Sequence, residues 1–231
     1  MARLRAKRMH YDRSVTVDLK TIPLFEGVPE ADLRLLADRT VTRNYPKQAI
    51  ILNEGDESDA LYLILGGRVK IYLADEHGKE LILAIKGPGQ YFGEMVLDGE
   101  ARSASVMTLE PAQFAILSRA DFKAFLLGHA SVALQLVQNL IRVARGLNQN
   151  LRNLAMLDVY GRVARILLQL AVERGDGKLE IPEKLTQKDI AARVGASREM
   201  INRILRDLTT GGYVSMQDGR IIINKAPPAR W

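Results

Sequence analysis

The sequence contains no cysteine, and this absence excludes several kinds of chemistry. Without a thiol the chain cannot form a disulfide, hold an iron–sulfur cluster or thiolate-bound zinc, or use a cysteine nucleophile. It also contains only three histidines. Hydrolytic enzymes commonly need clustered histidine and aspartate ligands or a base beside a nucleophile, and three scattered histidines supply neither. We therefore expect no catalytic residues and no metal site.

An apolar run of membrane-spanning length is also missing. No run approaches the roughly 18 to 20 residues needed to cross a bilayer, and the first residues, "MARLRAKRMHYDRS", lack the apolar stretch of a signal peptide. We therefore expect a cytoplasmic protein without a membrane partner. Hydrophobic residues nevertheless make up 47% of the 231 residues. This is enough for the core of one large domain or two smaller ones.

Hydrophobic patterning divides the chain into regions of different secondary structure. Residues 1–20 carry several cations and few large apolar side chains, which indicates a basic leader with no assigned fold. A short amphipathic helix is expected near 29–38, whereas 40–117 holds short β-rich runs such as "LYLIL" and "VKIYL" between glycine-rich turns. These hairpins favour a small barrel or sandwich with room for one ligand. The expected division is therefore an α+β chain with regions 1–20, 21–128, 129–157 and 158–227.

The third region reads as one long helix, "SVALQLVQNLIRVARGLNQNLRNLAML". Apolar residues recur with the 3-4 spacing of a coiled-coil seam. The seam residues are Leu136, Leu140, Val143, Leu147, Asn150 and Leu154. A polar residue such as Asn150 at a seam position fixes register in known coiled coils. This pattern predicts a homodimer, and the alternative is a helix that lies only on its own domain.

The segment "GEMVLDGEARSAS" places chemistry-bearing side chains inside the β-rich region. Arg102 and Ser103 suit a phosphate, because a guanidinium fork, a hydroxyl and exposed backbone amides bind planar anions. Glu94 is an acceptor that suits a sugar hydroxyl. The two charged residues could thus hold opposite sides of one small ligand. The alternative is a surface loop in which Glu94 and Arg102 form a salt bridge of little value.

The last region predicts two short helices joined by a tight turn and followed by a hairpin. Thr186 with Asp189 resembles a capping box, Gly195 ends that helix, and Ser197 caps the next. Asp218 and Gly219 favour a type I′ turn in the hairpin. In this helix-turn-helix geometry the second helix enters the DNA major groove.

Charge concentrates in this region. The chain has 33 Lys and Arg against 27 Asp and Glu, a net charge of +6. Residues 186–206 hold five cations and two anions, so 5 − 2 = +3 falls in about a tenth of the length. On the second helix the expected DNA-facing residues are Arg198, Glu199, Asn202 and Arg203, with Thr186 and Ser197 on phosphates. The expected packing residues are Met200, Ile201, Ile204, Leu205 and Leu208. The alternative is a charged face that contacts only solvent.

Three motifs together resemble the Crp/Fnr bacterial transcription regulators, over residues 20–226. "FGEM" with "RSAS" resembles the phosphate-binding cassette of cyclic-nucleotide domains, and "NLAMLDVYGRVARILLQLA" resembles the hinge and following helix. "LTQKDIAARVGASREMINRIL" resembles the helix-turn-helix of the family. The resemblance implies an N-terminal β-barrel of the double-stranded β-helix (jelly roll) type, a long dimerisation helix and a C-terminal winged helix-turn-helix.

The resemblance also implies roles for residues and partners. Glu94 would bind the ribose hydroxyl, Arg102 and Ser103 the cyclic phosphate, with Gly93 and Ala104 completing the effector site. Arg198, Glu199 and Arg203 would read half-sites similar to TGTGA. A symmetric dimer then implies a near-palindromic operator, and RNA polymerase is a further expected partner.

The identity of the effector is left with alternatives. Leu147 and Asn148 fall where cyclic-AMP-responsive members have a Thr-Ser pair that contacts adenine across the dimer. Similar "GEMxLDG" cassettes occur in a branch that responds to cyclic di-GMP. We expect cyclic AMP first and cyclic di-GMP second, and no haem or iron–sulfur cluster. His77, the one histidine placed like a haem ligand, is interpreted as an exposed turn residue. A dimer with a vestigial pocket and a nucleotide-hydrolysing enzyme are the remaining alternatives.

Overall fold

The computed structural model describes residues 18–57, 59–175 and 177–228. The chain forms two compact units, which are described separately. Unit 1 contains residues up to Leu73 and the segment Ala84–Leu140, whereas unit 2 contains Ala74–Leu83 and residues from Ile141 onward. Most of the predicted leader, residues 1–17, lies outside the described residues. Its last residues belong to the fold, because Leu19 is buried in the core of unit 1.

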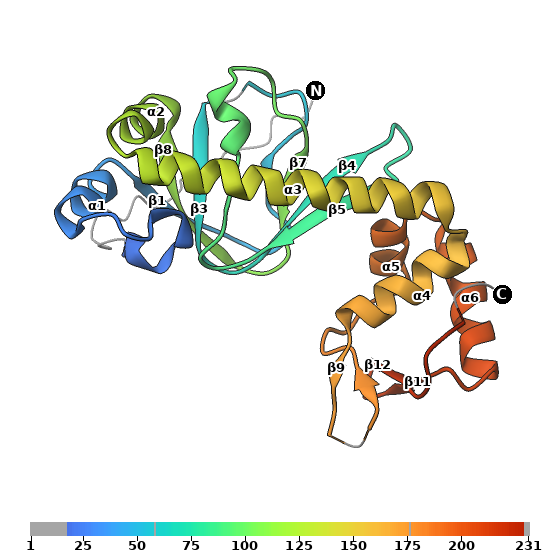
Figure 1. The fold of residues 1–231 in the computed structure, drawn as a ribbon. Coiled ribbons are helices and arrows are strands. Elements are labelled where there is room, and N and C mark those ends of the chain that lie inside the picture. The colour runs from blue at the N-terminus through green and yellow to red at the C-terminus, as the bar shows by residue number, and fades with distance from the viewer. Residues whose placement is uncertain (1–17, 58, 176, 229–231) are drawn as a thin grey trace. The chain divides into compact units, whose positions relative to one another are not determined.

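Unit 1 is built on two four-stranded sheets (Figure 1). One has the order β1-β8-β3-β6, with strands Val41–Tyr45, Ala112–Ser118, Ala60–Gly66 and Tyr91–Phe92. The other has the order β2-β7-β4-β5, with strands Ile50–Leu52, Ser105–Thr108, Val69–Ala74 and Glu80–Lys86. The last residue of β4 and the first four residues of β5 fall in the segment Ala74–Leu83, which is assigned to unit 2. The pairings of β8 with β1 and β3, and of β7 with β2 and β4, are antiparallel. The prediction of a β-rich region over residues 40–117 is confirmed.

Strand β3 lies between two hydrophobic cores. Successive side chains of a strand point to opposite faces, so a strand buried on both faces is apolar throughout. Leu61 and Leu63 pack into one core with the helices of the unit. Ile64 belongs to the other core, and Tyr62 packs against that core and stacks on Phe92 at 4.9 Å between ring centroids. This explains the unbroken apolar run "LYLIL".

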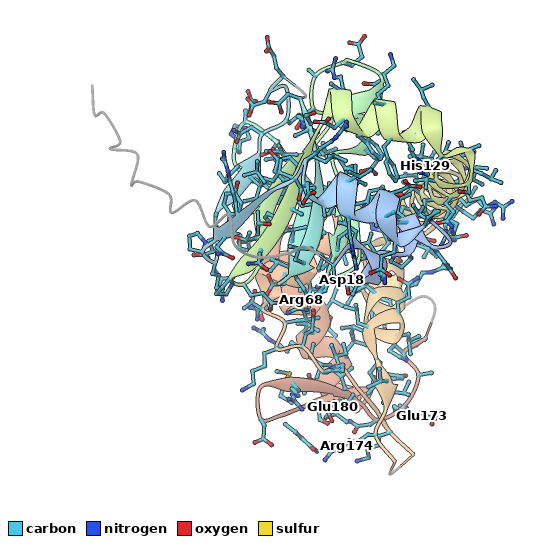
Figure 2. All side chains as sticks on the ribbon, turned by 90° about the vertical axis from the view of Figure 1, so that its left-hand side faces the viewer. Asp18, Arg68, His129, Glu173, Arg174 and Glu180 are labelled. Carbon is cyan, nitrogen blue, oxygen red and sulfur yellow. The ribbon has the colours of Figure 1, made fainter. Side chains whose placement is uncertain are left out.

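The helices of unit 1 cover the first of these cores. They are the short 3-10 helices η1 (Leu19–Thr21) and η2 (Pro23–Phe25), α1 (Glu30–Ala37) and α2 (Arg119–Gly128). His129 joins the end of α2 to α1: its Nδ1 lies 2.9 Å from the Phe125 carbonyl oxygen and its Nε2 lies 3.2 Å from Asp32 Oδ2 (Figure 2). The long helix α3 (Ala130–Met156) follows, as predicted, and the boundary between the units falls within it.

Unit 2 contains three further helices and a four-stranded sheet of order β11-β12-β10-β9. The helices are α4 (Val159–Leu170), α5 (Gln187–Val194) and α6 (Arg198–Thr210). The strands are β9 (Val172–Glu173), β10 (Leu179–Glu180), β11 (Val214–Gln217) and β12 (Arg220–Ile223). One buried cluster, which includes Val163, Ile190, Ile201 and Ile223, joins the helices to the sheet.

The sequence expectation for residues 171–185 was incomplete. The helix was expected to continue through Glu173 and to be followed by a plain break, but Ala171 is extended and Val172–Glu173 is strand β9. Glu180 lies between two arginines, 2.8 Å from Arg220 Nη1 and 3.8 Å from Arg174 Nε (Figure 2). Two-residue strands carry no periodicity of their own, so tertiary pairing alone reveals them.

Within the described residues, no single helix has the length and apolar character needed to cross a membrane. Helices α2 and α3 meet that requirement only as a pair, and they are bent by 113° at the break between them.

Candidate functional site

The turn after β6 brings the backbone close to an arginine. Gly93 has φ +83°, the left-handed region in which glycine avoids the strain of a Cβ atom, and it precedes the 3-10 helix η3 (Glu94–Leu97). A Cβ atom at this position would lie 2.7 Å from Arg102 Nη1. Glycine is therefore required both for the conformation and for the close approach.

Arg102 is buried beneath this turn. Its side chain is 3% exposed, its Nη2 donates to the Ala60 carbonyl oxygen at 2.8 Å, and its Nη1 donates to the Gly93 carbonyl oxygen at 3.2 Å. Asp59 Oδ1 lies 3.9 Å from Nη2 on an exposed side chain. The Nε atom is buried without a hydrogen-bond partner among the described residues. A buried guanidinium that contacts mostly neutral carbonyls has unused capacity for an anion.

The electrostatics of Arg102 follow from this burial. Loss of water around the guanidinium lowers the pKa of Arg102 from its ordinary value, and the neighbouring Tyr62 and Asp59 oppose that shift. Arginine nevertheless stays charged at neutral pH, because its ordinary pKa lies far above 7. The surface-loop alternative is wrong, since this arginine is buried.

Glu94 pairs with a residue that was not among the predicted ones. Its Oε1 lies 3.5 Å from Lys86 Nζ, and each of the two side chains is 16% exposed. The same Nζ donates to the Tyr91 carbonyl oxygen at 2.8 Å. Among the described residues, no direct ion pair joins Glu94 to Arg102. Lys86 was missed because "KGPGQ" was assigned to a turn, whereas β5 runs through Lys86.

The remaining cassette residues lie beside η3. Ser103 is exposed and its Oγ lies 2.9 Å from Met95 Sδ, whereas Ala104 is buried. The loop that carries them is held to the turn after β2, because Arg102 N donates to the Asp56 carbonyl oxygen and Gly55 N donates to the Arg102 carbonyl oxygen, both at 2.8 Å. Backbone bonds thus fix the position of Arg102 in the sheet framework.

His77 has a different environment from the cassette. Its side chain is 83% exposed, and its Nε2 lies 3.6 Å from Glu76 Oε1. This agrees with the interpretation of an exposed turn residue. The part of the chain that the structure describes contains no group of three or more His, Asp or Glu side chains arranged to hold a metal ion.

Helix α3 exposes an apolar stripe. Four predicted seam residues are between 40% and 49% exposed: Leu140, Val143, Leu147 and Leu154. Asn148 and Asn150 are also exposed. Leu136 is the exception, because it is 4% exposed and packs with Val132 in the core of unit 1. The single chain therefore uses Leu136 for its own core, and the exposed stripe begins at Leu140.

The helix-turn-helix of unit 2 has the predicted caps. Thr186 and Asp189 form a complete capping box at the start of α5, and Gly195 ends this helix with φ +71°. Ser197 Oγ accepts a hydrogen bond from Met200 N at 3.2 Å at the start of α6. The type I′ prediction agrees with positive φ angles at Asp218 and Gly219, the two residues between β11 and β12. Local sequence therefore determines each boundary of the motif.

One face of α6 is polar and exposed. Its exposed residues include Arg198, Glu199, Asn202 and Arg203, and Ile201, Ile204 and Leu208 are buried on the opposite face. Backbone hydrogen bonding at Glu199, followed by the Ser197 hydroxyl, lowers the pKa of Glu199. This side chain is therefore an ionised acceptor at neutral pH.

Two expectations for this region need correction. Met200 was expected to pack but is 39% exposed, whereas Leu205 packs beside Ile201, Ile204 and Leu208 on the core of unit 2. Arg193 was counted in the cationic cluster, but its Nη2 pairs with Glu183 Oε2 at 3.0 Å and its side chain is only 12% exposed. Asn202 Oδ1 accepts from Gln187 Nε2 at 3.2 Å, which links α6 to α5.

Comparison with known families agrees with both halves of the chain. Residues 42–129 match the model of the cyclic nucleotide-binding domain, and residues 161–227 match that of the Crp-like helix-turn-helix domain.

Whole-chain relatives give the same result. The chain is 33% identical to the CRP-like cAMP-activated global transcriptional regulator of Mycobacterium tuberculosis, over 87% of this chain and 92% of the relative. It is 34% identical to the cyclic AMP receptor protein of Thermus thermophilus, over 90% of this chain and 95% of the relative.

A solved structure shares the fold. The c-di-GMP responsive global regulator of Xanthomonas campestris is 23% identical, with a TM-score of 0.75 that covers 85% of this chain and all of that one. The relative from Mycobacterium tuberculosis is named as a transcriptional regulator. The chain therefore belongs to the Crp/Fnr family of DNA-binding transcription regulators, with a cyclic nucleotide-binding domain followed by a Crp-like helix-turn-helix domain.

Proposed function

We propose that a cyclic nucleotide binds at the cassette of unit 1 and controls how two copies of α6 meet DNA. Arg102 carries this proposal: it is a guanidinium out of water, and its Nε has no partner among the described residues. The cyclic phosphate would accept from Arg102 and from the exposed Ser103 hydroxyl, with Ala104 beside them. Glu94 would accept from the ribose 2′-hydroxyl, and Gly93 allows the close approach.

Cyclic AMP is the first proposed effector and cyclic di-GMP the second. Two relatives at 33% and 34% identity carry cyclic AMP in their names. The structural neighbour described as c-di-GMP responsive supports the second effector. In a dimer, Leu147 and Asn148 would face the base, and only Asn148 offers it an amide.

Control of DNA binding would require a homodimer formed through α3. The ligand must favour one arrangement of the two subunits, and a coupling of about 1 to 3 kcal/mol changes DNA affinity about 5- to 150-fold. The two α6 helices would then lie in successive major grooves about 34 Å apart on a near-palindromic operator with TGTGA-like half-sites. Regions 21–128, 129–157 and 158–227 would be the sensor, the dimerisation helix and the DNA-binding domain, and RNA polymerase would be a partner at promoters.

The test combines two titrations of the purified protein. Calorimetry with cyclic AMP, cyclic GMP and cyclic di-GMP identifies the effector, and gel shifts with an inverted TGTGA duplex and a scrambled duplex measure DNA binding with and without each nucleotide. We expect cyclic AMP to bind and to raise affinity for the first duplex. Absence of binding by all three nucleotides would overturn the effector proposal. Equal DNA affinity with and without a bound nucleotide would instead support the vestigial-pocket alternative.

A further inference from the structure

Lys86 connects the cassette carboxylate to a rigid part of unit 1. Its Nζ lies 3.5 Å from Glu94 Oε1 and donates to the Tyr91 carbonyl oxygen at 2.8 Å. It also lies 5.4 Å from the centroid of the Tyr91 ring. The Lys86 side chain is only 16% exposed, so its ammonium group needs partners in place of water, and these contacts provide them.

Tyr91 is held on three sides. Its backbone is paired with Leu63 in the register of β6 and β3, and its side chain is buried in the core of unit 1. Its hydroxyl accepts a hydrogen bond from Asn139 Nδ2 on α3 at 2.8 Å. The carbonyl oxygen that Lys86 contacts therefore belongs to a residue whose backbone and side chain are both held in place.

Glu94 has less local support. It begins η3, a 3-10 helix of four residues whose preceding residue, Gly93, makes no side-chain cap. Such a short segment does not by itself fix the direction of a long carboxylate side chain. The contact with Lys86 uses one oxygen, Oε1, and an ionised carboxylate has a second acceptor oxygen, Oε2.

We propose that Lys86 is a positioning residue that aims the Glu94 carboxylate at the ribose 2′-hydroxyl of the effector. This rests on the proposed function and adds a residue to the site. Lys86 acts through Glu94 and Tyr91 rather than by contact with the ribose. It therefore determines selectivity for ribose over 2′-deoxyribose, which a lysine that only stabilised the fold would leave unchanged.

The experiment compares the dissociation constants of cyclic AMP and 2′-deoxy cyclic AMP by calorimetry. In the wild-type protein we expect cyclic AMP to bind about tenfold more tightly, the value of one charge-assisted hydrogen bond. In Lys86→Met this ratio should fall to about one, and Lys86→Arg should recover most of it. The ratio is insensitive to general losses of charge or stability, because these weaken both ligands equally. An unchanged ratio in Lys86→Met overturns the proposal.

A double variant tests whether Lys86 acts through Glu94. In the Glu94→Gln, Lys86→Met double variant, the ratio of the two dissociation constants should equal the ratio in Glu94→Gln alone. A further fall would contradict the positioning role. If Lys86→Met is too unstable to titrate, Lys86→Gln replaces it, because glutamine keeps a neutral donor. We expect a ratio of about three in this variant. A ratio equal to that of the wild type would also overturn the proposal.

The outcome separates this proposal from the one on which it rests. A wild-type protein that binds none of cyclic AMP, 2′-deoxy cyclic AMP, cyclic GMP and cyclic di-GMP refutes both proposals. Wild-type binding of cyclic AMP together with an unchanged ratio in the Lys86 variants refutes only the role of Lys86.

Discussion

Among single residues, Arg102 has two roles, one in the fold and one in the proposed site. It holds the carbonyl groups of Ala60 and Gly93, and it is the cation proposed to meet a phosphate. A charged side chain is rarely buried unless its surroundings compensate it. Neutral carbonyl groups compensate the buried guanidinium only in part. The remaining donor capacity of Arg102 is therefore available to the proposed phosphate.

Arg102→Ala should lose the nucleotide response and also lower stability. From the sequence alone, only the loss of response is expected, with thermal melting unchanged. The structure changes this expectation, because removal of the side chain takes a charged donor away from the Ala60 and Gly93 carbonyl oxygens, of which the Gly93 oxygen keeps Val96 N at 3.0 Å. We expect a cost of about 1–3 kcal/mol in the free energy of unfolding. Urea unfolding followed by circular dichroism measures this. Arg39→Ala, at an exposed arginine paired with Asp121, should change it by less than about 1 kcal/mol. Equal stability of the two variants would show that the Arg102 contacts contribute little.

Gly93→Ala should disturb Arg102 directly. The new Cβ atom would lie 2.7 Å from Arg102 Nη1 in addition to the strain of φ +83°. Gly27→Ala is the matched control, since Gly27 has φ +79° and a Cβ atom there would meet nothing within 4 Å. Strain alone costs about 1–2 kcal/mol, so we expect that loss in Gly27→Ala, and a larger loss together with weakened nucleotide binding in Gly93→Ala. Similar melting temperatures and nucleotide affinities for the two variants would contradict the close approach.

Among elements, α6 is divided into two faces by its own periodicity. Ile201, Ile204 and Leu208 return every three or four residues and bind the helix to the core of unit 2. The exposed face that remains carries Arg198 and Arg203 near a capped N-terminus. Packing against the core holds the opposite face of α6, and the Ser197 cap holds its N-terminus. The polar face is therefore available for contact with base edges.

Arg203→Ala should weaken binding to an inverted TGTGA duplex by about 1–3 kcal/mol and change binding to a scrambled duplex little. Gel shifts at one salt concentration with both duplexes measure the difference. Arg206→Ala removes the same charge from the same helix outside the proposed base-reading set, and it should weaken both duplexes to a similar, smaller extent. If Arg203→Ala also weakens both equally, Arg203 is a phosphate contact.

The contact between β6 and α3 is expected to transmit the effector signal. Tyr91→Phe removes the hydroxyl that Asn139 contacts while it keeps the ring in the core. We expect cyclic AMP affinity to change by less than about twofold, while the ratio of DNA affinities with and without cyclic AMP falls several-fold, because coupling requires differential contacts.

Asn139→Ala provides the partner measurement for this contact. It should reduce the same ratio, and the double variant should show no further reduction, since both changes remove one interaction. Additive effects of the two changes would show that Tyr91 and Asn139 act separately.

At the scale of the whole molecule, the apolar stripe of α3 is a surface that a single chain leaves exposed. Leu140, Leu147 and Leu154 are each at least 40% exposed, and contiguous apolar residues on a long helix are typical of an interface. A second copy of the same helix would bury them and give the symmetry that a palindromic operator requires.

A Leu147→Glu, Leu154→Glu double variant should therefore be monomeric at concentrations where the wild type is a dimer. Each buried leucine contributes about 1.5–3 kcal/mol, so loss of two raises the dissociation constant of the dimer by at least about 100-fold. Sedimentation velocity measures the mass. Leu127→Glu, at an 82% exposed leucine of α2, should remain dimeric. A monomeric wild type, or a dimeric double variant, would refute dimerisation through α3.

The sequence by itself determined the order of the main elements and the caps that bound α5 and begin α6. Thr186, Asp189, Gly195 and Ser197 act on backbone groups within a few residues, so their effect on helix ends is local and readable from spacing. The apolar strands and the long helix follow from periodicity in the same way.

Only the tertiary structure decided which side chains meet in the site. Three features of the site depend on contacts between different elements of the fold. They are the pairing of Glu94 with Lys86, the burial of Arg102 beneath Gly93 and the burial of Leu136 in the core. Burial and ion pairing are set by distance in space, and a sequence gives that distance only where one helix or strand connects the residues.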